Sequence, residues 1–293
     1  MNYWVIVGEG GGYEEVKGIK SNSGSASSGG INRTTMTMDD LVFTMENGGR
    51  TKLFVRGEEA APPDVFMLWG HYNEVFEGIS LRLTSLGARS VNDIDAKRLV
   101  CSKLLTSLLL QKEGIPQAKT MIVTHNTPAK LVADAVGLPA VLKPSDGAQG
   151  AGVVLLSSEE EIADYLAAIP EGRGMSTVAQ EYIATSKGTD IRVCMADGEV
   201  LYAIRRISNN PDEFRSNVHL GGRYESVEPD EAALDLCRRT AKAVGLRLCG
   251  IDLLLTGDGY VVGEVNCTPG MPGDDFVKGE HFKRTMYRLI TTE

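Results

Sequence analysis

The chain has 293 residues, of which 42% are hydrophobic and 24% are charged, a composition typical of a globular protein. Its formal charge of −9 argues against a nonspecific nucleic-acid binder, because proteins hold a phosphate backbone with an excess of lysine and arginine. No run approaches the roughly 20 apolar residues that span a bilayer, and the five cysteines form no C-x-x-C pair, so we expect a cytoplasmic protein with reduced thiols.

The N-terminal part alternates strands with a helix. Three short apolar runs are typical of strands: residues 3–7, 53–55 and 64–69. Residues 73–86 carry apolar side chains at helical spacing. The Ser/Gly-rich segment 21–30 is predicted to be a mobile loop. This alternation predicts an α/β domain over residues 1–95.

The middle of the chain begins with the strongest helical pattern, over residues 95–112, which Gly114 ends. Shorter helices are expected at residues 127–137 and 157–168, because each begins with a capping hydroxyl.

Between these shorter helices, residues 141–156 read VLKPSDGAQGAGVVLL. In a Walker A loop the lysine follows the glycines, whereas Lys143 precedes them. A dinucleotide fingerprint is followed by a helix, whereas the β-branched residues after Gly152 favour a strand. The pattern therefore predicts a strand, a glycine loop and a strand, which can fold over phosphates as a flap. Taken alone, it fits a glycine-rich surface hairpin equally well.

Two hairpins are predicted in the C-terminal part, residues 177–293. Residues 190–206 flank Asp197-Gly198, a strong two-residue turn signal, and residues 251–266 flank Gly257-Asp258-Gly259. Between the hairpins, residues 229–244 repeat apolar side chains at helical spacing.

The second hairpin carries a candidate metal site. Glu264 and Asn266 are two residues apart on a strand and so share a face. Asp252 lies opposite Glu264 if the turn is the three-residue loop Gly257-Asp258-Gly259. Oxygen-only ligands of this kind suit magnesium. A solvated sheet face is the alternative, but both acids lie within apolar runs, where an uncompensated charge is unfavourable.

The motifs VLKPSDGAQGAGVVLL, QEYI, TDIRV, FRSNVHLGG, GIDLLL and GEVNCTPG, in this order and spacing, resemble the ATP-grasp superfamily. They are most similar to the RimK-type ATP-dependent carboxylate–amine ligases, from about Asp64 to the C-terminus, whereas residues 1–60 match weakly. The resemblance implies an α/β (α+β lobes) chain with the ATP-grasp fold. A Rossmann-like pre-ATP-grasp domain at 1–95 would precede a small lobe with the glycine flap at 96–176 and a C-terminal lobe with the metal site at 177–293.

The resemblance also implies which residues bind ATP. Two lysines and a flap glycine would hold its phosphates, and two hinge residues would bind adenine. An acid would contact the nucleotide, and an R-S-N segment would lie along the phosphates. These residues are, in that order, Lys103, Lys143, Gly150, Glu181, Tyr182, Asp190, Arg215, Ser216 and Asn217. Two Mg²⁺ or Mn²⁺ ions would bind Asp252, Glu264 and Asn266, with Glu264 bridging.

The implied reaction has two steps: a carboxylate attacks the γ-phosphate of ATP, and an amine then attacks the resulting acyl phosphate. Arg192, Arg205 and Arg215 are the candidates to stabilise the developing charge. The expected partners are an amine, first of all an amino acid, and a carboxylate on a peptide, protein tail or metabolite. No nucleic-acid or membrane partner is expected, and a homo-oligomer is compatible with the resemblance.

Two alternatives stay open: a small-molecule kinase on the same fold and a noncatalytic ATP-binding regulator. One position also departs from the RimK pattern, because Leu220 stands where that branch has a basic residue able to hold a substrate carboxylate. The residues Asn209-Asn210-Pro211 add an insertion in the same loop. Both features argue against assuming glutamate as the substrate.

Overall fold

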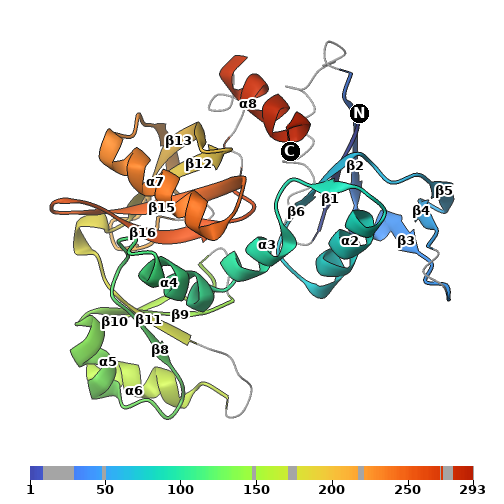
Figure 1. Ribbon diagram of the computed structural model, residues 1–293. Coiled ribbons are helices and arrows are strands. Elements are labelled where there is room, and N and C mark those ends of the chain that lie inside the picture. Colours follow the sequence, from blue (N-terminus) through green and yellow to red (C-terminus); the bar gives the residue numbers. More distant parts are fainter. Residues whose placement is uncertain are drawn as a thin grey trace. The chain divides into compact units, whose positions relative to one another are not determined.

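The computed structural model describes residues 1–8, 30–47, 51–146, 150–170, 177–216, 221–270, 272 and 280–292 (Figure 1). The predicted mobile loop at 21–30 lies outside these residues except for Gly30. The chain divides into two compact units. The first comprises Met1–Arg98, Leu246–Leu248 and Cys267–Glu293, and the second comprises Leu99–Gly245 and Cys249–Asn266. The three-part division at 95/96 and 176/177 stays a prediction.

The first unit is built on a parallel sheet with the strand order β2-β1-β6-β7. Its strands are β1 (Asn2–Val7), β2 (Asn32–Thr37), β6 (Val65–Trp69) and β7 (Arg89–Ser90). Helix α2 (Glu74–Ser85) begins at Asn73, whose side chain accepts a hydrogen bond from the Phe76 amide. Phe76 and Leu83 of this helix are fully buried in one cluster with Ile6 and Phe66 of the sheet. The predicted strands at 3–7 and 64–69 and the helix at 73–86 are confirmed.

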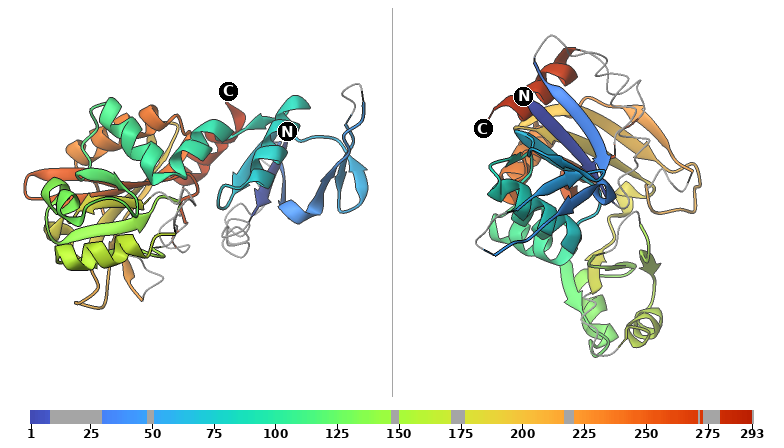
Figure 2. Two further views of the ribbon diagram at one scale, coloured as in Figure 1. Left: turned by 90° about the horizontal axis from the view of Figure 1, so that it is seen from below. Right: turned by 90° about the vertical axis from the view of Figure 1, so that its right-hand side faces the viewer.

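Further elements complete the first unit. A 3₁₀ turn (Met38–Asp40) leads into a small antiparallel sheet at the side of the parallel one (Figures 1 and 2). Its strands are β3 (Leu41–Phe43), β4 (Leu53–Val55) and β5 (Glu58–Ala60). The C-terminal helix α8 (Glu280–Thr291) buries Phe282 and Leu289. Among the described residues, no helix combines the length and apolar character needed to cross a bilayer.

The prediction of one helix over residues 95–112 is wrong in one respect, because the segment forms two helices. Helix α3 (Ile94–Val100) ends before Ser102, and α4 (Lys103–Lys112) begins after it. The Ser102 hydroxyl caps α4 by accepting from the Leu105 amide at 3.3 Å, and the Lys103 amide donates to the Ser145 carbonyl at 2.9 Å. A serine competes for backbone hydrogen bonds inside a helix, so here it starts a new one. Lys103 is therefore the first residue of α4.

The second unit contains a four-stranded antiparallel sheet with the order β10-β9-β11-β8. Its strands are β8 (Thr120–Val123), β9 (Ala140–Pro144), β10 (Val154–Leu156) and β11 (Thr177–Glu181). Helices α5 (Ala129–Val136) and α6 (Glu159–Ala167) bury Val132 and Ile162 against Leu142 of this sheet. Strands β9 and β10 pair on either side of the glycine stretch, which confirms the predicted order of strand, glycine loop and strand.

A five-stranded sheet, β14-β13-β12-β15-β16, carries both predicted hairpins. The strands are β12 (Thr189–Ala196), β13 (Glu199–Ile207), β14 (Arg223–Ser226), β15 (Leu248–Thr256) and β16 (Gly259–Asn266). A 3₁₀ turn (Ala184–Ser186) precedes β12. Helix α7 (Glu231–Val244) is capped by Asp230 and ends at Gly245 in a left-handed conformation, φ 71°, which glycine adopts without strain. The hairpins and the predicted helix at 229–244 are confirmed.

Candidate functional site

A pocket lies within the described part of the second unit and is lined by residues of both its four-stranded and its five-stranded sheet. Most of the predicted ATP-binding and metal residues line it: Lys103, Lys143, Gly150, Glu181, Tyr182, Asp190, Arg215, Ser216, Asp252 and Glu264. Asn217, together with Leu220, lies outside the described residues. Segments more than a hundred residues apart in the sequence thus line one cavity.

Apolar side chains contribute to the lining of the pocket, and we call the space beside them the apolar recess. Val141, Ile183 and Leu254 line it, and the rings of Tyr182 and Phe214 meet edge to face with centroids 6.3 Å apart. At the end of β11, the Glu181 amide donates to the Lys119 carbonyl at 2.9 Å. A flat aromatic or heterocyclic group would find apolar contact here, because such rings bind between apolar walls with a few fixed polar groups beside them.

Two lysines also line the pocket, one from α4 and one from β9. The Lys103 ammonium lies 3.4 Å from a Glu264 carboxylate oxygen. Burial lowers the pKa of Lys143 to about 8, although the nearby Glu264 carboxylate opposes this shift. Cations in a recess poor in water attract anions such as phosphate far more strongly than exposed ones do.

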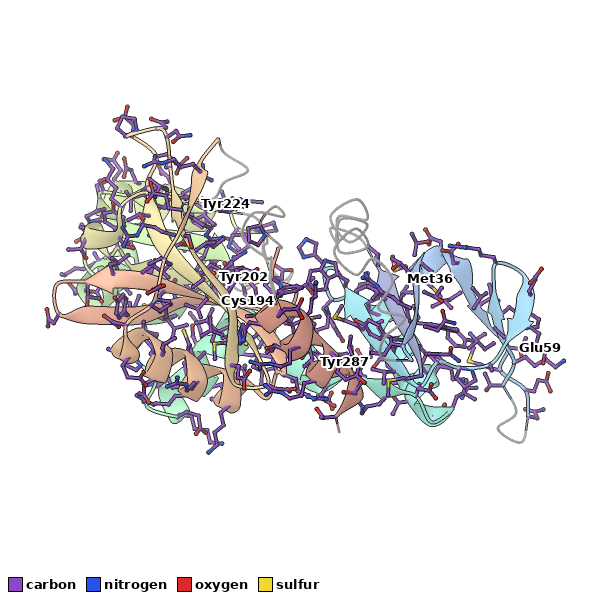
Figure 3. All side chains as sticks on the ribbon, turned by 90° about the horizontal axis from the view of Figure 1, so that it is seen from above. Met36, Glu59, Cys194, Tyr202, Tyr224 and Tyr287 are labelled. Carbon is purple, nitrogen blue, oxygen red and sulfur yellow. The ribbon has the colours of Figure 1, made fainter. Side chains whose placement is uncertain are left out.

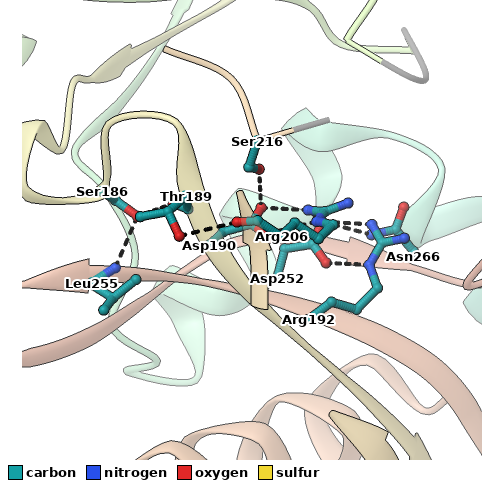
Figure 4. A network of polar contacts seen from close by, with 9 residues as sticks. All are labelled: Ser186, Thr189, Asp190, Arg192, Arg206, Ser216, Asp252, Leu255 and Asn266. Atoms are coloured by element: carbon teal, nitrogen blue, oxygen red, sulfur yellow. Dashed lines mark hydrogen bonds and ion pairs between the residues drawn. The ribbon is translucent and has the colours of Figure 1, made fainter. Parts of the chain in front are cut away.

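A buried ionic network forms one wall of the pocket (Figure 4). Arg192 donates two hydrogen bonds to Asp252, at 2.7 and 2.8 Å. Arg206 donates to the other side of the network, to Asp252 at 2.7 Å and to Asp190 through two bonds, one of them 2.7 Å long. The Ser216 hydroxyl donates to Asp190 at 2.6 Å. The network therefore pairs two buried carboxylates with two guanidinium groups.

The two carboxylates respond differently to this environment. Burial would raise the pKa of Asp252, but Arg192 and Arg206 together hold it down at about 2. Burial raises the pKa of Asp190. Arg206 opposes this shift, and within the described network it is the one guanidinium group bonded to Asp190. Asp252 is thus held ionised and in a fixed orientation, whereas the charge of Asp190 depends on Arg206.

Asp252 and Glu264 are cross-strand neighbours, as predicted, but the predicted reason is wrong. The turn contains two residues, Gly257 and Asp258, because Thr256 already pairs with Gly259. A β-bulge at Gly263 then shifts the register by one residue. A two-residue turn plus one bulged residue gives the same offset as a three-residue loop, so Asp252 still faces Glu264.

The structure does not bring Arg205 to this network, and its neighbour Arg206 lies there instead. A plain two-residue turn at Asp197-Gly198 would set Arg205 opposite Asp190. However, Cys194 pairs with Tyr202, both labelled in Figure 3, while Met195 pairs with Val200. Leu201 is therefore an extra, bulged residue. The bulge turns Arg206 to the network and Arg205 to the opposite face. No turn signal in the sequence predicts this bulge.

Arg215 lies at the pocket's edge next to the described end of the glycine loop. Its guanidinium donates to the Gly150 carbonyl at 3.1 Å and makes two hydrogen bonds to the Glu213 carboxylate, to which the Arg215 backbone amide donates a third. These bonds to Arg215 hold the pKa of Glu213 below its usual value. Gly150 itself has φ 76°, a conformation that favours glycine.

The donors at the predicted metal site are all oxygen-bearing. Asp252 and Glu264 supply carboxylates, and Asn266 donates through its amide nitrogen to Asp252 at 3.3 Å, which leaves the amide oxygen for another partner. This set suits Mg²⁺ or Mn²⁺. Within the described residues, no group of three or more His, Cys, Asp or Glu side chains gathers that could hold a metal. An ion here would therefore need further oxygens, from water or from phosphates.

Comparison with known proteins gives a consistent picture. The model of the RimK-like ATP-grasp domain matches residues 101–290. A "Probable alpha-L-glutamate ligase" of Picosynechococcus sp. is 35% identical over 196 residues, 66% of this chain and 64% of that protein. One from Vibrio vulnificus (strain YJ016) is 30% identical over 242 residues, 82% of this chain and 80% of that protein. The chain spans 45% of a third such relative, from Shewanella pealeana.

Solved structures share the fold. The D-alanine–D-alanine ligase of Bacillus anthracis complexed with ATP superimposes with a TM-score of 0.68 at 20% identity, over 98% of this chain and 91% of that one. The ATP-grasp ligase PsnB complexed with a precursor peptide and AMPPNP superimposes with a TM-score of 0.65 at 23% identity, over 91% and 88%. The ATP-grasp fold expected from the sequence motifs is confirmed, and the chain belongs to the RimK-like ATP-grasp family.

Proposed function

We propose that this chain is an ATP-dependent ligase that joins an amine to a carboxylate through an acyl phosphate. The observation that carries the proposal is one pocket lined by two lysines and by the carboxylates of Asp252 and Glu264, with the apolar recess in the same pocket. A nucleoside triphosphate has the matching parts, a flat base and a chain of phosphates. The family and the names of its relatives support a ligase acting on amino acids or peptides.

In this proposal ATP is a substrate and the pocket residues bind it. The adenine would lie in the apolar recess beside the backbone of Glu181 and Tyr182, and Asp190 would contact the nucleotide. Lys103 and Lys143 would hold the phosphates as point charges, and the loop around Gly150 would cover them. Three residues that follow one another in the sequence, Arg215, Ser216 and Asn217, are proposed to lie along the phosphates.

Asp252, Glu264 and Asn266 are the residues that would hold the two Mg²⁺ or Mn²⁺ ions of this proposal. The ions would neutralise phosphate charge and act as Lewis acids on the phosphoryl oxygens. Arg192 and Arg206 would keep the Asp252 carboxylate ionised and oriented, because both guanidinium groups bond to it.

The chemistry asks little nucleophilicity of the protein, since the attacking groups belong to the substrates. The chain's own contribution is to place the carboxylate in line with the γ-phosphate and to stabilise the developing charge. Arg215 is suited to this role because it lies at the pocket and retains donors beyond its bonds to Glu213. Arg192 would act through Asp252, and Arg206 replaces Arg205 in the proposal, because Arg205 faces away from the network.

The experiment is an ADP-release assay with purified protein, Mg²⁺ or Mn²⁺, mixtures of amino acids, and carboxylates from small acids to peptides. Glutamate is the first amine to test because of the relatives' names. Mass spectrometry of the products should find an amide, formed with loss of water. A stable phosphorylated product without amine would instead identify a kinase, and nucleotide binding without turnover would identify a regulator.

A matched pair of variants tests the site itself. Glu264→Gln keeps the shape of the side chain and removes its charge, so it should abolish turnover. Asp258→Asn makes the same change at the exposed turn of the same hairpin and should leave turnover unchanged. Near-normal turnover by Glu264→Gln would refute the metal assignment.

A further inference from the structure

The bulge in β16 places one residue without a ladder partner next to a proposed metal ligand. Val262 pairs with Leu253 and Glu264 pairs with Asp252, so Gly263 lies between them as the inserted residue. Such a bulge usually re-aims the side chains beside it. Here it sets which residue of β16 faces Asp252.

Gly263 is also a point where the hairpin backbone lies close to a side chain of the pocket. A Cβ atom at this position would lie 2.9 Å from Leu254 Cγ and 3.2 and 3.3 Å from its two methyl groups. Real Cβ atoms essentially never lie closer than 3.0 Å to another heavy atom, so a side chain at 263 must displace Leu254 or the bulge. By contrast, nothing lies within 4 Å of a Cβ built on Gly257 in the same hairpin.

Leu254 cannot move without consequence. It is two residues from Asp252 on β15 and so points to the same face. Leu254 and Gly263 both line the pocket. A displaced Leu254 side chain would enter the space available to a ligand, whereas a displaced bulge would carry Glu264 away from Asp252.

We propose that Gly263 is a positioning residue for nucleotide binding, acting through Leu254. Its missing side chain lets Leu254 lie back against the bulged backbone, which keeps the apolar recess open while Glu264 stays opposite Asp252. This inference rests on the proposed function, because it takes the ligand of the recess to be a nucleotide.

The test compares Gly263→Ala in two backgrounds. Calorimetry would measure the affinity for a nonhydrolysable ATP analogue, with Mn²⁺ and with EDTA. In the unchanged background, Gly263→Ala should weaken binding roughly tenfold or more, the scale of overpacking at a tight contact. In a Leu254→Ala background the same change should weaken binding by less than about twofold, because the Leu254 atoms that would collide with Cβ are absent. Gly257→Ala is the matched control and should not change the affinity.

A loss that appears in EDTA as well as in Mn²⁺ means that Leu254 fills the recess. A loss confined to Mn²⁺ means that Glu264 has shifted, and both results support the positioning role. Unchanged affinity of Gly263→Ala, or an equal loss in the Leu254→Ala background, would overturn it. If Gly263→Ala folds poorly, recovery of the folded protein in the double variant supports the same contact, and no recovery opposes it. Failure of the unchanged chain to bind any nucleotide would instead refute the proposed function.

Discussion

Replacing Arg206 by methionine should destabilise the protein strongly, because it leaves Asp190 buried without its guanidinium partner. Arg206 is 8% exposed and its guanidinium bonds to two carboxylates, Asp190 and Asp252. Asp252 keeps a second guanidinium, that of Arg192, whereas Asp190 keeps only the Ser216 hydroxyl among its bonds in the described network. The main effect of the substitution should therefore fall on Asp190.

Breaking one partner of a buried ion pair typically lowers the free energy of unfolding by about 3–5 kcal/mol. We expect this range for Arg206→Met at pH 7.5, measured by urea denaturation. The matched control is Arg205→Met. It removes the same group one residue earlier, from the opposite face, where the Arg205 Nε has no hydrogen-bond partner in the described part of the chain. Its effect should stay below about 1 kcal/mol.

The deficit of Arg206→Met should also depend on pH. Burial already raises the pKa of Asp190, and without Arg206 it would rise further above its unfolded value. A carboxyl group with a raised pKa in the folded state stabilises the fold below its unfolded pKa, and this contribution is lost as the pH rises. The difference between variant and unchanged protein should thus be smaller at pH 4.5 than at pH 7.5. Equal effects of Arg205→Met and Arg206→Met, or a deficit that grows at low pH, would refute the assignment.

Three further predictions concern the pocket and its border. Burial lowers the pKa of Lys143 to about 8, so the protein should take up protons when it binds an ATP analogue at pH 9 but not at pH 6.5. Calorimetry in two buffers would measure this uptake, and Lys143→Arg should abolish it. Mn²⁺ should bind roughly tenfold or more weakly in the absence of nucleotide than in its presence, because guanidinium and ammonium groups already neutralise Asp252 and Glu264. Electron paramagnetic resonance would measure both affinities, and equal values would contradict this prediction. Ser102→Ala should lower the free energy of unfolding by about 1 kcal/mol, and Ser102→Gly by less.

Much of the fold could be predicted from local patterns. The runs at 3–7 and 64–69 became strands because β-branched and aromatic side chains pack well in a sheet, and here both faces of these strands are buried. In residues 141–156, the lysine before the glycines argued against a Walker A loop, and the β-branched residues after them argued against a dinucleotide fingerprint. Strands β9 and β10 pair on either side of these glycines, as predicted. The break between α3 and α4 was missed because the apolar spacing continues across it, although the serine at 102 is a capping residue.

The site itself depends on features that no local pattern contains. A register shift of one residue turns every following side chain to the other face of the sheet. In the hairpin of β12 and β13, a bulge at Leu201 makes this shift, so Arg206 replaces Arg205 at the network. In the hairpin of β15 and β16, the bulge at Gly263 cancels an error in the predicted turn, so Glu264 is found where it was expected.

The two bulges together determine which charges meet in the pocket. Without the bulge at Leu201, Arg205 instead of Arg206 would lie opposite Asp190, so a guanidinium group would be beside that acid in either register. Without the bulge at Gly263, Asp252 would pair with Gly263, and the Glu264 carboxylate would turn to the opposite face of the sheet. A register error of one residue in β16 would therefore separate two proposed metal ligands while leaving the sheet's hydrogen bonds intact.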